Sequence, residues 1–253
     1  MMPHHESKAV PDWMLPFGLA GDEKMQAKQD LSSTIHVWRI SLVPCPAQDD
    51  GLARALAPAE RARADRFRFP ADRARWVRTR GIVRALLGGY LRCPPAHVPL
   101  TAGAHGKPIL TPGFRANSLS FNWSHTNDLA LLAVTQGGEV GIDVERVRTD
   151  FDPWTTAQSV FSAGELACLR DTAPAQSHAL FFKFWTAKEA LLKSLGTGFT
   201  ACPTDYCAAA LAQSHVIRTQ GLTVRTLCLG GGHAAALASS LKDPQICGHD
   251  WHD

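Results

Sequence analysis

The segment Val140-Gly141-Ile142-Asp143-Val144-Glu145 carries the clearest local pattern in this 253-residue chain. Side chains alternate between the two faces of a β-strand, so the valines and the isoleucine can enter a core together while Gly141, Asp143 and Glu145 share the other face. The two acids then lie about 6.6 Å apart along the strand. A bound divalent cation would offset their repulsion. A solvent-facing edge strand with two harmless acids explains the same pattern.

The elements around this segment predict an α+β protein. Alternation predicts strands at 34–43, 119–123 and 139–145, and an almost wholly apolar run predicts one at 129–135. Two more strands are expected at 222–229 and 233–239, on either side of the glycines at 230–232. Apolar residues at three- and four-residue intervals predict a long helix after Pro70, frayed at Gly88 and Gly89, and helices at 155–170 and 175–195.

The order of strand, helices and hairpin occurs twice, which predicts two pseudo-symmetric lobes with a ligand site between them. Each lobe is expected to pair a small antiparallel sheet with a long helix. The expected divisions are an N-terminal extension at 1–30, lobes at 31–138 and 139–245, and a tail at 246–253.

Two further constellations carry polar chemistry. In the helix expected at 175–195, Glu189 and Lys193 are four residues apart and therefore share a face. They form either an ordinary ion pair or a metal-holding acid beside a phosphate-binding lysine. The stretch Phe121-Asn122-Trp123-Ser124-His125 ends a strand in a Ser-His pair, but the glycine-flanked elbow of a nucleophilic serine is missing. A structural histidine is the alternative there.

Composition sets the broad class of the protein. Hydrophobic residues make up 45% of the chain and charged residues 19%, as in an ordinary globular domain. No apolar run reaches the roughly 18 residues of a membrane span, and the N-terminus has no signal-peptide pattern. Seven cysteines without paired spacing favour free thiols and a cytoplasmic protein.

Positive charge is concentrated in residues 51–92, which hold eleven arginines and no lysine against three acids, a balance of +8. Such a zone attracts acidic proteins, phosphorylated small molecules or nucleic acid, or is simply a solvated helix surface. The segment has no nucleic-acid-binding motif, so we expect no nucleic-acid partner.

The order and spacing of the motifs resemble those of one known family. The chain contains Arg66-Phe67 and Arg75, then Gly106-Lys107-Pro108, Phe121-Asn122-Trp123-Ser124-His125, Gly141-Ile142-Asp143-Val144-Glu145 and Trp185-Thr186-Ala187-Lys188-Glu189-Ala190. This series resembles the surfactin-type (group II) 4′-phosphopantetheinyl transferases over about residues 34–240. Glu60 departs from the pattern, because a basic residue is expected there.

The resemblance implies a magnesium-dependent enzyme that transfers phosphopantetheine from coenzyme A to a serine of an apo carrier protein and releases 3′,5′-ADP. It implies magnesium ligands at Asp143, Glu145 and Glu189, with Glu189 also the candidate base and Lys193 a catalytic lysine beside the scissile pyrophosphate. The implied coenzyme A contacts are Arg63, Arg75, Lys107, Ser124, His125, Lys188 and Lys193.

The resemblance also bears on partners. Carrier proteins of this class are typically acidic, so the arginine-rich segment would steer them. A monomer is expected, because one chain supplies both lobes, and no membrane partner is expected. The alternative to an enzyme is a non-catalytic module that binds coenzyme A or a carrier protein.

Overall fold

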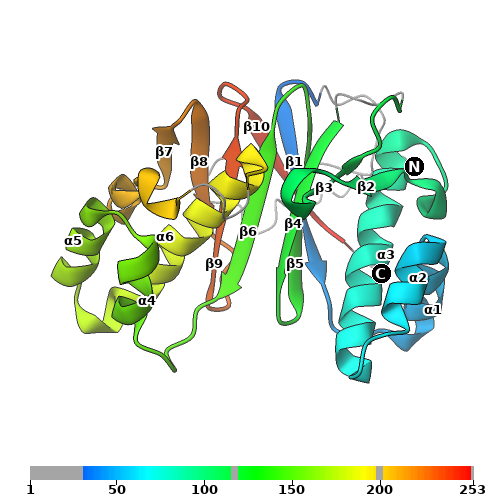
Figure 1. Cartoon of the computed structure of the whole chain (residues 1–253), viewed down its shortest axis with the longest axis horizontal. Coiled ribbons are helices and arrows are strands. Elements are labelled where there is room, and N and C mark those ends of the chain that lie inside the picture. The colour runs from blue at the N-terminus through cyan, green and yellow to red at the C-terminus, as the bar shows by residue number, and fades with distance from the viewer. Residues whose placement is uncertain (1–30, 115–118, 198–201, 252–253) are drawn as a thin grey trace, which may run out of the picture.

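The computed structural model describes residues 31–114, 119–197 and 202–251, so the predicted extension at 1–30 lies outside the described residues. The fold is mixed α+β, as predicted. Two four-stranded sheets stand side by side in the middle of the molecule, and helices cover the outer face of each sheet (Figure 1). The polypeptide therefore forms four layers in the order helix, sheet, sheet, helix.

The first half of the chain supplies most of one sheet and its helices. Its elements are β1 (Thr34–Ser41), α1 (Pro46–Ala55), α2 (Pro58–Ala64), α3 (Pro70–Leu91), β2 (Leu100–Ala102), β3 (Pro108–Leu110), β4 (Leu119–Thr126) and β5 (Leu129–Gln136). The long helix predicted after Pro70 is α3, which continues through Gly88 and Gly89 and ends at Leu91. Arg92 then turns into the left-handed conformation, with φ of 52°.

The second half repeats the plan. Its elements are β6 (Val140–Arg146), α4 (Pro153–Val160), α5 (Ala163–Asp171), α6 (Pro174–Leu195), β7 (Val216–Thr219), β8 (Leu222–Leu227) and β9 (His233–Ser239). The strand order is β6-β9-β8-β7, with antiparallel pairs throughout. The helical region predicted at 155–170 is two helices, because the backbone extends at Phe161 and Ser162 before the capping box of Ser162 and Glu165 starts α5.

The C-terminal segment corrects the prediction of a tail. Residues Gln245–Asp250 form β10, which pairs in parallel with β1 and completes a sheet of order β10-β1-β5-β4. The expected tail is thus wrong for residues 246–250, and this sheet is not wholly antiparallel. Ile246 and Cys247 are buried, and Asp250 accepts two hydrogen bonds from Arg39, at 2.6 and 3.1 Å.

The two sheets share an apolar core. Val140, Ile142 and Val144 of β6, which alternation placed on one face, pack with Ile35 and Leu131 from the other sheet. The hydrophobic face of β6 therefore points between the lobes, and its polar face points toward α6. In the described part of the chain, no helix combines the length and apolarity needed to cross a membrane.

Candidate active site

The site begins at a seam between two edge strands, β4 of one sheet and β6 of the other. Side chains rather than a backbone ladder join these strands. The Ile142 amide donates to Asn122 Oδ1 at 2.9 Å, and the Arg146 amide donates to Thr126 Oγ1 at 3.3 Å. Ser124 lies between Asn122 and Thr126 on the same face of β4, and this placement sets its hydroxyl against Asp143.

Helix α6 lies directly against the polar face of β6, and Gly141 makes that approach possible. A Cβ atom at position 141 would lie 2.0 Å from the Ala190 carbonyl oxygen and 2.3 Å from the Ser194 amide nitrogen. The missing side chain therefore admits the backbone of α6. As a result Glu189 and Lys193, one turn apart on α6, are brought to the carboxylates of β6.

Asp143 is the centre of the site. Its side chain is 2–3% exposed, and its Oδ1 accepts hydrogen bonds from Ser124 Oγ at 2.7 Å and from Lys193 Nζ at 2.6 Å. Lys193 Nζ also donates to Ser124 Oγ at 3.1 Å. Asp143 Oδ2 is buried and has no hydrogen-bond partner among the described residues. A buried carboxylate oxygen without a partner is costly to the fold unless a ligand uses it.

The negative charge of Asp143 raises the pKa of two more carboxyl groups, those of Glu145 and Glu189. Burial, and then the negative charge of Asp143, raise the pKa of Glu145. Burial also raises the pKa of Glu189, the positive charge of Lys193 lowers it, and the charges of Asp143 and Glu145 raise it further. Glu145 and Glu189 are both half-buried. The charges of three acids on β6 and α6 are thus coupled to one another and to the ammonium group of Lys193.

This donor set suits a hard divalent cation. Magnesium prefers carboxylate oxygens and keeps some ligand positions for water or substrate phosphate. In the described ranges no group of three His, Cys, Asp or Glu side chains is placed so that it could hold a metal ion. The unpartnered Asp143 Oδ2, with Glu145 and Glu189 near it, nevertheless offers the oxygens that such an ion needs.

The end of β4 adds basic groups to the same place. Partial burial lowers the pKa of His125, and the positive charges of Lys193 and Arg75 lower it further. The charge of His125 is therefore coupled to a lysine of the second lobe and to an arginine of the first. Arg75 itself is held by Asp72 at 3.0 Å and by Asp128 at 3.7 Å.

Comparisons with known proteins identify the family of the chain. Residues 41–137 match the family model described as 4′-phosphopantetheinyl transferase, N-terminal, and residues 139–245 match the 4′-phosphopantetheinyl transferase superfamily. The 4′-phosphopantetheinyl transferase HetI of Nostoc sp. is 42% identical over 168 residues, which cover 66% of this chain and 71% of HetI. The chain belongs to the 4′-phosphopantetheinyl transferase family.

Two further relatives are similar to shorter parts of this transferase. The 4′-phosphopantetheinyl transferase AcpT of Salmonella typhimurium is 41% identical over 95 residues, or 37% of this chain and 47% of AcpT. The L-aminoadipate-semialdehyde dehydrogenase-phosphopantetheinyl transferase of Xenopus laevis is 28% identical over 166 residues, or 61% of this chain and 54% of the relative. The family predicted from the motif order is confirmed, and the protein is an enzyme of the phosphopantetheinyl transferase class.

The remaining predicted residues of the transferase are spread along the seam. Lys107 Nζ donates to the carbonyl oxygens of Val140 and Ser194 and to Glu139 Oε2, each at 3.3 Å, so Lys107 ties the first lobe to the start of β6 and the end of α6. Burial lowers the pKa of Lys107, and Glu139 raises it in part. Arg63 is exposed, with its guanidinium 5.8 Å from the centre of the Trp76 ring.

Lys188 does not join the carboxylate group, against the sequence-based expectation that it contacts coenzyme A. Its side chain is 4% exposed and forms a 2.9 Å ion pair with the fully buried Glu165. It also donates to the carbonyl oxygens of Pro203, at 2.6 Å, and Tyr206. Its position on α6 differs from that of Glu189 by one residue, about 100° around the helix axis, which turns it into the core of the second lobe. We therefore do not retain Lys188 as a coenzyme A contact.

Sequence reasoning missed Asn122 and Thr126, which hold the seam on either side of Ser124. The signal was present, because all three polar residues alternate along β4 with Phe121, Trp123 and His125. Sequence reasoning also gave no role for Glu60. Glu60 accepts a hydrogen bond from the buried Arg84, so the acid at this position neutralises an arginine of α3.

Proposed function

We propose that this transferase moves the 4′-phosphopantetheine group of coenzyme A to a serine of an apo acyl or peptidyl carrier protein, with magnesium, and releases 3′,5′-ADP. The observation that supports this most directly is the buried Asp143, which has a lysine and a serine on one carboxylate oxygen and nothing on the other. A carboxylate can bind a metal ion and a lysine can bind a pyrophosphate, so the two groups together suit a substrate that carries both.

Asp143, Glu145 and Glu189 would hold the magnesium ion, since they supply carboxylate oxygens from two adjoining elements. When bound, the ion would neutralise charge on the pyrophosphate and help to orient it. In the described structure Lys193 already donates to Asp143 and is half-exposed. Its ammonium group is therefore placed to contact an incoming phosphate beside the same carboxylate.

The nucleotide end of coenzyme A would lie along the first lobe. Arg75 and His125 are electrostatic neighbours, and Ser124 adjoins them on β4. Arg63 and Lys107 are basic groups of the same lobe, at α2 and at the start of the seam. We propose that these five side chains bind the nucleotide part of coenzyme A, chiefly its 3′-phosphate.

The chemistry needs a base for the carrier serine and a group that stabilises the departing phosphate. Glu189 is our candidate base, directly or through a water, because it lies in the carboxylate cluster and is half-buried rather than enclosed. Lys193 would stabilise or protonate the 3′,5′-ADP phosphate as the phosphorus–oxygen bond breaks. The serine proton passes to Glu189 as the new phosphodiester forms.

We further propose that the arginine-rich α2–α3 region steers an acidic carrier, and that one chain acts as a monomer because it contributes both sides of the seam. Steering by charge predicts that added salt raises the KM for the carrier. A KM that does not respond to salt would remove the steering proposal and leave the transfer reaction in place.

The test is intact-protein mass spectrometry of an apo carrier protein incubated with the transferase, coenzyme A and magnesium. A gain of one phosphopantetheine group that a chelator abolishes would support the reaction and its metal. Glu189→Gln should lower turnover at least a hundredfold, whereas Asp150→Asn, an exposed acid beyond the end of β6, should not. Tight coenzyme A binding with no transfer to several carriers would favour the non-catalytic module instead.

A further inference from the structure

The ammonium group of Lys193 lies against the carboxylate that is proposed to hold the metal. Lys193 Nζ is 2.6 Å from Asp143 Oδ1 and 3.1 Å from Ser124 Oγ, and Ser124 Oγ donates to the same carboxylate oxygen at 2.7 Å. Asp143 Oδ1 therefore accepts two hydrogen bonds, one of them from a cation, while Oδ2 has no partner in the described ranges. In this arrangement a lysine, rather than a metal ion, compensates the charge of Asp143.

The same lysine compensates the two other acids in part. Burial raises the pKa of Glu145 and that of Glu189, and the positive charge of Lys193 lowers both. The two partners of the ion pair differ in their access to water, because the Asp143 side chain is 3% exposed and that of Lys193 is 29% exposed. The carboxylate is therefore fixed in the interior, whereas the ammonium group can turn toward a ligand that arrives from the solvent.

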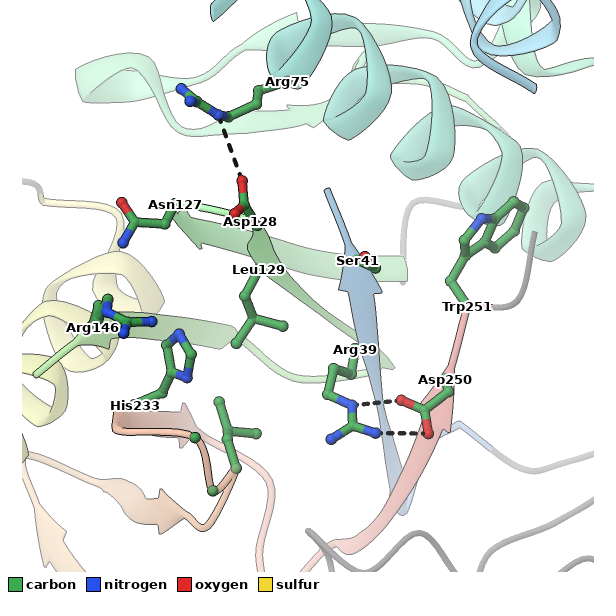
Figure 2. Close-up of a pocket in the computed structure, with 13 residues that line it drawn as sticks. Arg39, Ser41, Arg75, Asn127, Asp128, Leu129, Arg146, His233, Asp250 and Trp251 are labelled. Carbon is green, nitrogen blue, oxygen red and sulfur yellow. Dashed lines mark hydrogen bonds and ion pairs between the residues drawn. The ribbon is translucent and has the colours of Figure 1, made fainter. Parts of the chain in front are cut away.

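The other cations near the seam are directed elsewhere. Figure 2 shows Arg75 pointing to Asp128, which is 3.7 Å away, and Arg146 beside His233 at a cavity of about 660 Å³. Among the residues that the structure describes, Lys193 is the only lysine or arginine that forms an ion pair with any of the three acids of the site. The compensation of these acids thus depends on one flexible side chain.

A divalent cation and an ammonium group compete for the same buried carboxylate. Like charges at hydrogen-bonding distance repel each other strongly where water is largely excluded. A metal ion on Asp143 therefore requires Lys193 to move away, and the displaced ammonium group needs another anion. A phosphate group of a substrate supplies that anion. The competition also explains why the described acids are not placed to hold a metal ion while the lysine remains between them.

We propose that Lys193 holds the place of the metal ion on Asp143 and leaves it only when a pyrophosphate takes the ammonium group. The inference rests on the proposed function, since it takes Asp143, Glu145 and Glu189 as the metal ligands and coenzyme A as the source of the pyrophosphate. No covalent bond changes in this exchange. One ion pair between lysine and carboxylate is replaced by a contact of the carboxylate with the metal and a contact of the lysine with phosphate. The free enzyme therefore binds the metal weakly.

Manganese binding to the full chain tests this exchange without a carrier protein, and hence without transfer. The electron paramagnetic resonance signal of free Mn²⁺ measures the dissociation constant. Lys193→Met removes the ammonium group and keeps a side chain of similar shape, so without coenzyme A it should bind Mn²⁺ at least tenfold more tightly than the wild-type protein does. Coenzyme A should raise the Mn²⁺ affinity of the wild-type protein at least tenfold and that of the variant by a smaller factor.

Two further variants separate the contact from other effects. Lys193→Gln is also neutral but keeps a hydrogen-bond donor for Asp143, so it should show the same gain in Mn²⁺ affinity and serves if the methionine variant does not fold. Arg148→Met is the matched control, because Arg148 is exposed and its charge acts on Glu145 through space. Its Mn²⁺ affinity should stay within threefold of the wild-type value.

Other outcomes overturn the inference. If the folded Lys193 variants bind Mn²⁺ no more tightly than the wild-type protein without coenzyme A, and only their coenzyme A affinity falls, Lys193 is a phosphate contact and does not hold the metal's place. An equal gain in Arg148→Met would show a general effect of charge. Failure of the wild-type protein to bind Mn²⁺ even with coenzyme A would remove the metal from the proposed function as well, which distinguishes the two kinds of failure.

Discussion

Replacement of Gly141 by alanine tests how the fold creates the site. The new Cβ would stand 2.0 Å from the Ala190 carbonyl oxygen, where side chains essentially never come closer than 3.0 Å. Strand β6 and helix α6 must therefore separate by about 1 Å. Because the obstacle is backbone on both sides, the cost should reach the upper end of overpacking penalties, about 3 kcal/mol. For a chain of this size that lowers Tm by roughly 6–12 °C.

The same movement should damage catalysis in molecules that remain folded. It carries Glu189 and Lys193 away from Asp143, whose Oδ1 is 2.6 Å from Lys193 Nζ. A misplacement of about 1 Å at reacting groups can cost a hundredfold in rate. We therefore expect kcat of Gly141→Ala to fall by about two orders of magnitude at a temperature well below its Tm.

Thermal unfolding and single-turnover transfer to an apo carrier measure the two effects. Gly51→Ala is the control, because Gly51 lies inside α1 with its nearest contact 3.9 Å away, and alanine there should stabilise the helix by about 1 kcal/mol. A Gly141→Ala protein with the wild-type Tm and kcat would refute the argument that α6 depends on this glycine for its position.

Three further predictions concern stability. Lys188→Met leaves Glu165 buried without its cation, so the free energy of unfolding in urea should fall by about 3–5 kcal/mol. The Kd for coenzyme A should stay within twofold. A higher Kd in the folded variant would restore Lys188 as a coenzyme A contact. Burial lowers the pKa of His36 from 6.5 to about 4, so the unfolded chain takes up the proton at a higher pH than the folded chain does. The free energy of unfolding should therefore fall by roughly 3 kcal/mol as pH drops from about 6.5 to 4. In urea melts at different pH, His36→Gln should flatten this dependence, and the exposed control His105→Asn should not. Truncation after Pro244 removes β10 and should abolish cooperative unfolding in calorimetry, whereas a true tail would be lost without effect.

Local periodicity predicted the parts of the fold that depend on neighbouring residues. The alternation in β6 placed Val140, Ile142 and Val144 together in the core and put Asp143 on the other face, and the structure agrees. The Glu189–Lys193 spacing likewise predicted a shared helix face. In both cases the pattern is set by the geometry of a single element, which the sequence shows directly.

Contacts between distant segments could not be predicted in the same way. The last residues, from Cys247 to Asp253, are too polar and too few to suggest a strand, and the partner of β10, β1, lies at the other end of the described chain. Lys188 belongs to the same motif as Glu189, and only the packing of α6 shows that one faces Glu165 and the other the carboxylates. At Gly141 the residue type alone does not name the group that approaches the backbone, and in the structure that group is α6.

The position of the carboxylates on an edge strand follows from these contacts. A central strand would have both backbone edges occupied by ladders, whereas among the described strands β6 pairs with β9 alone and turns its other edge to β4. The side chains of Asn122 and Thr126 accept hydrogen bonds from two backbone amides along that edge. These bonds hold β4 and β6 side by side without a continuous backbone ladder. Between these two bonds the seam has room for Ser124 and Asp143 to meet. The site therefore exists because polar side chains join the edge strands of the two sheets, and because α6 comes close enough to add Glu189 and Lys193.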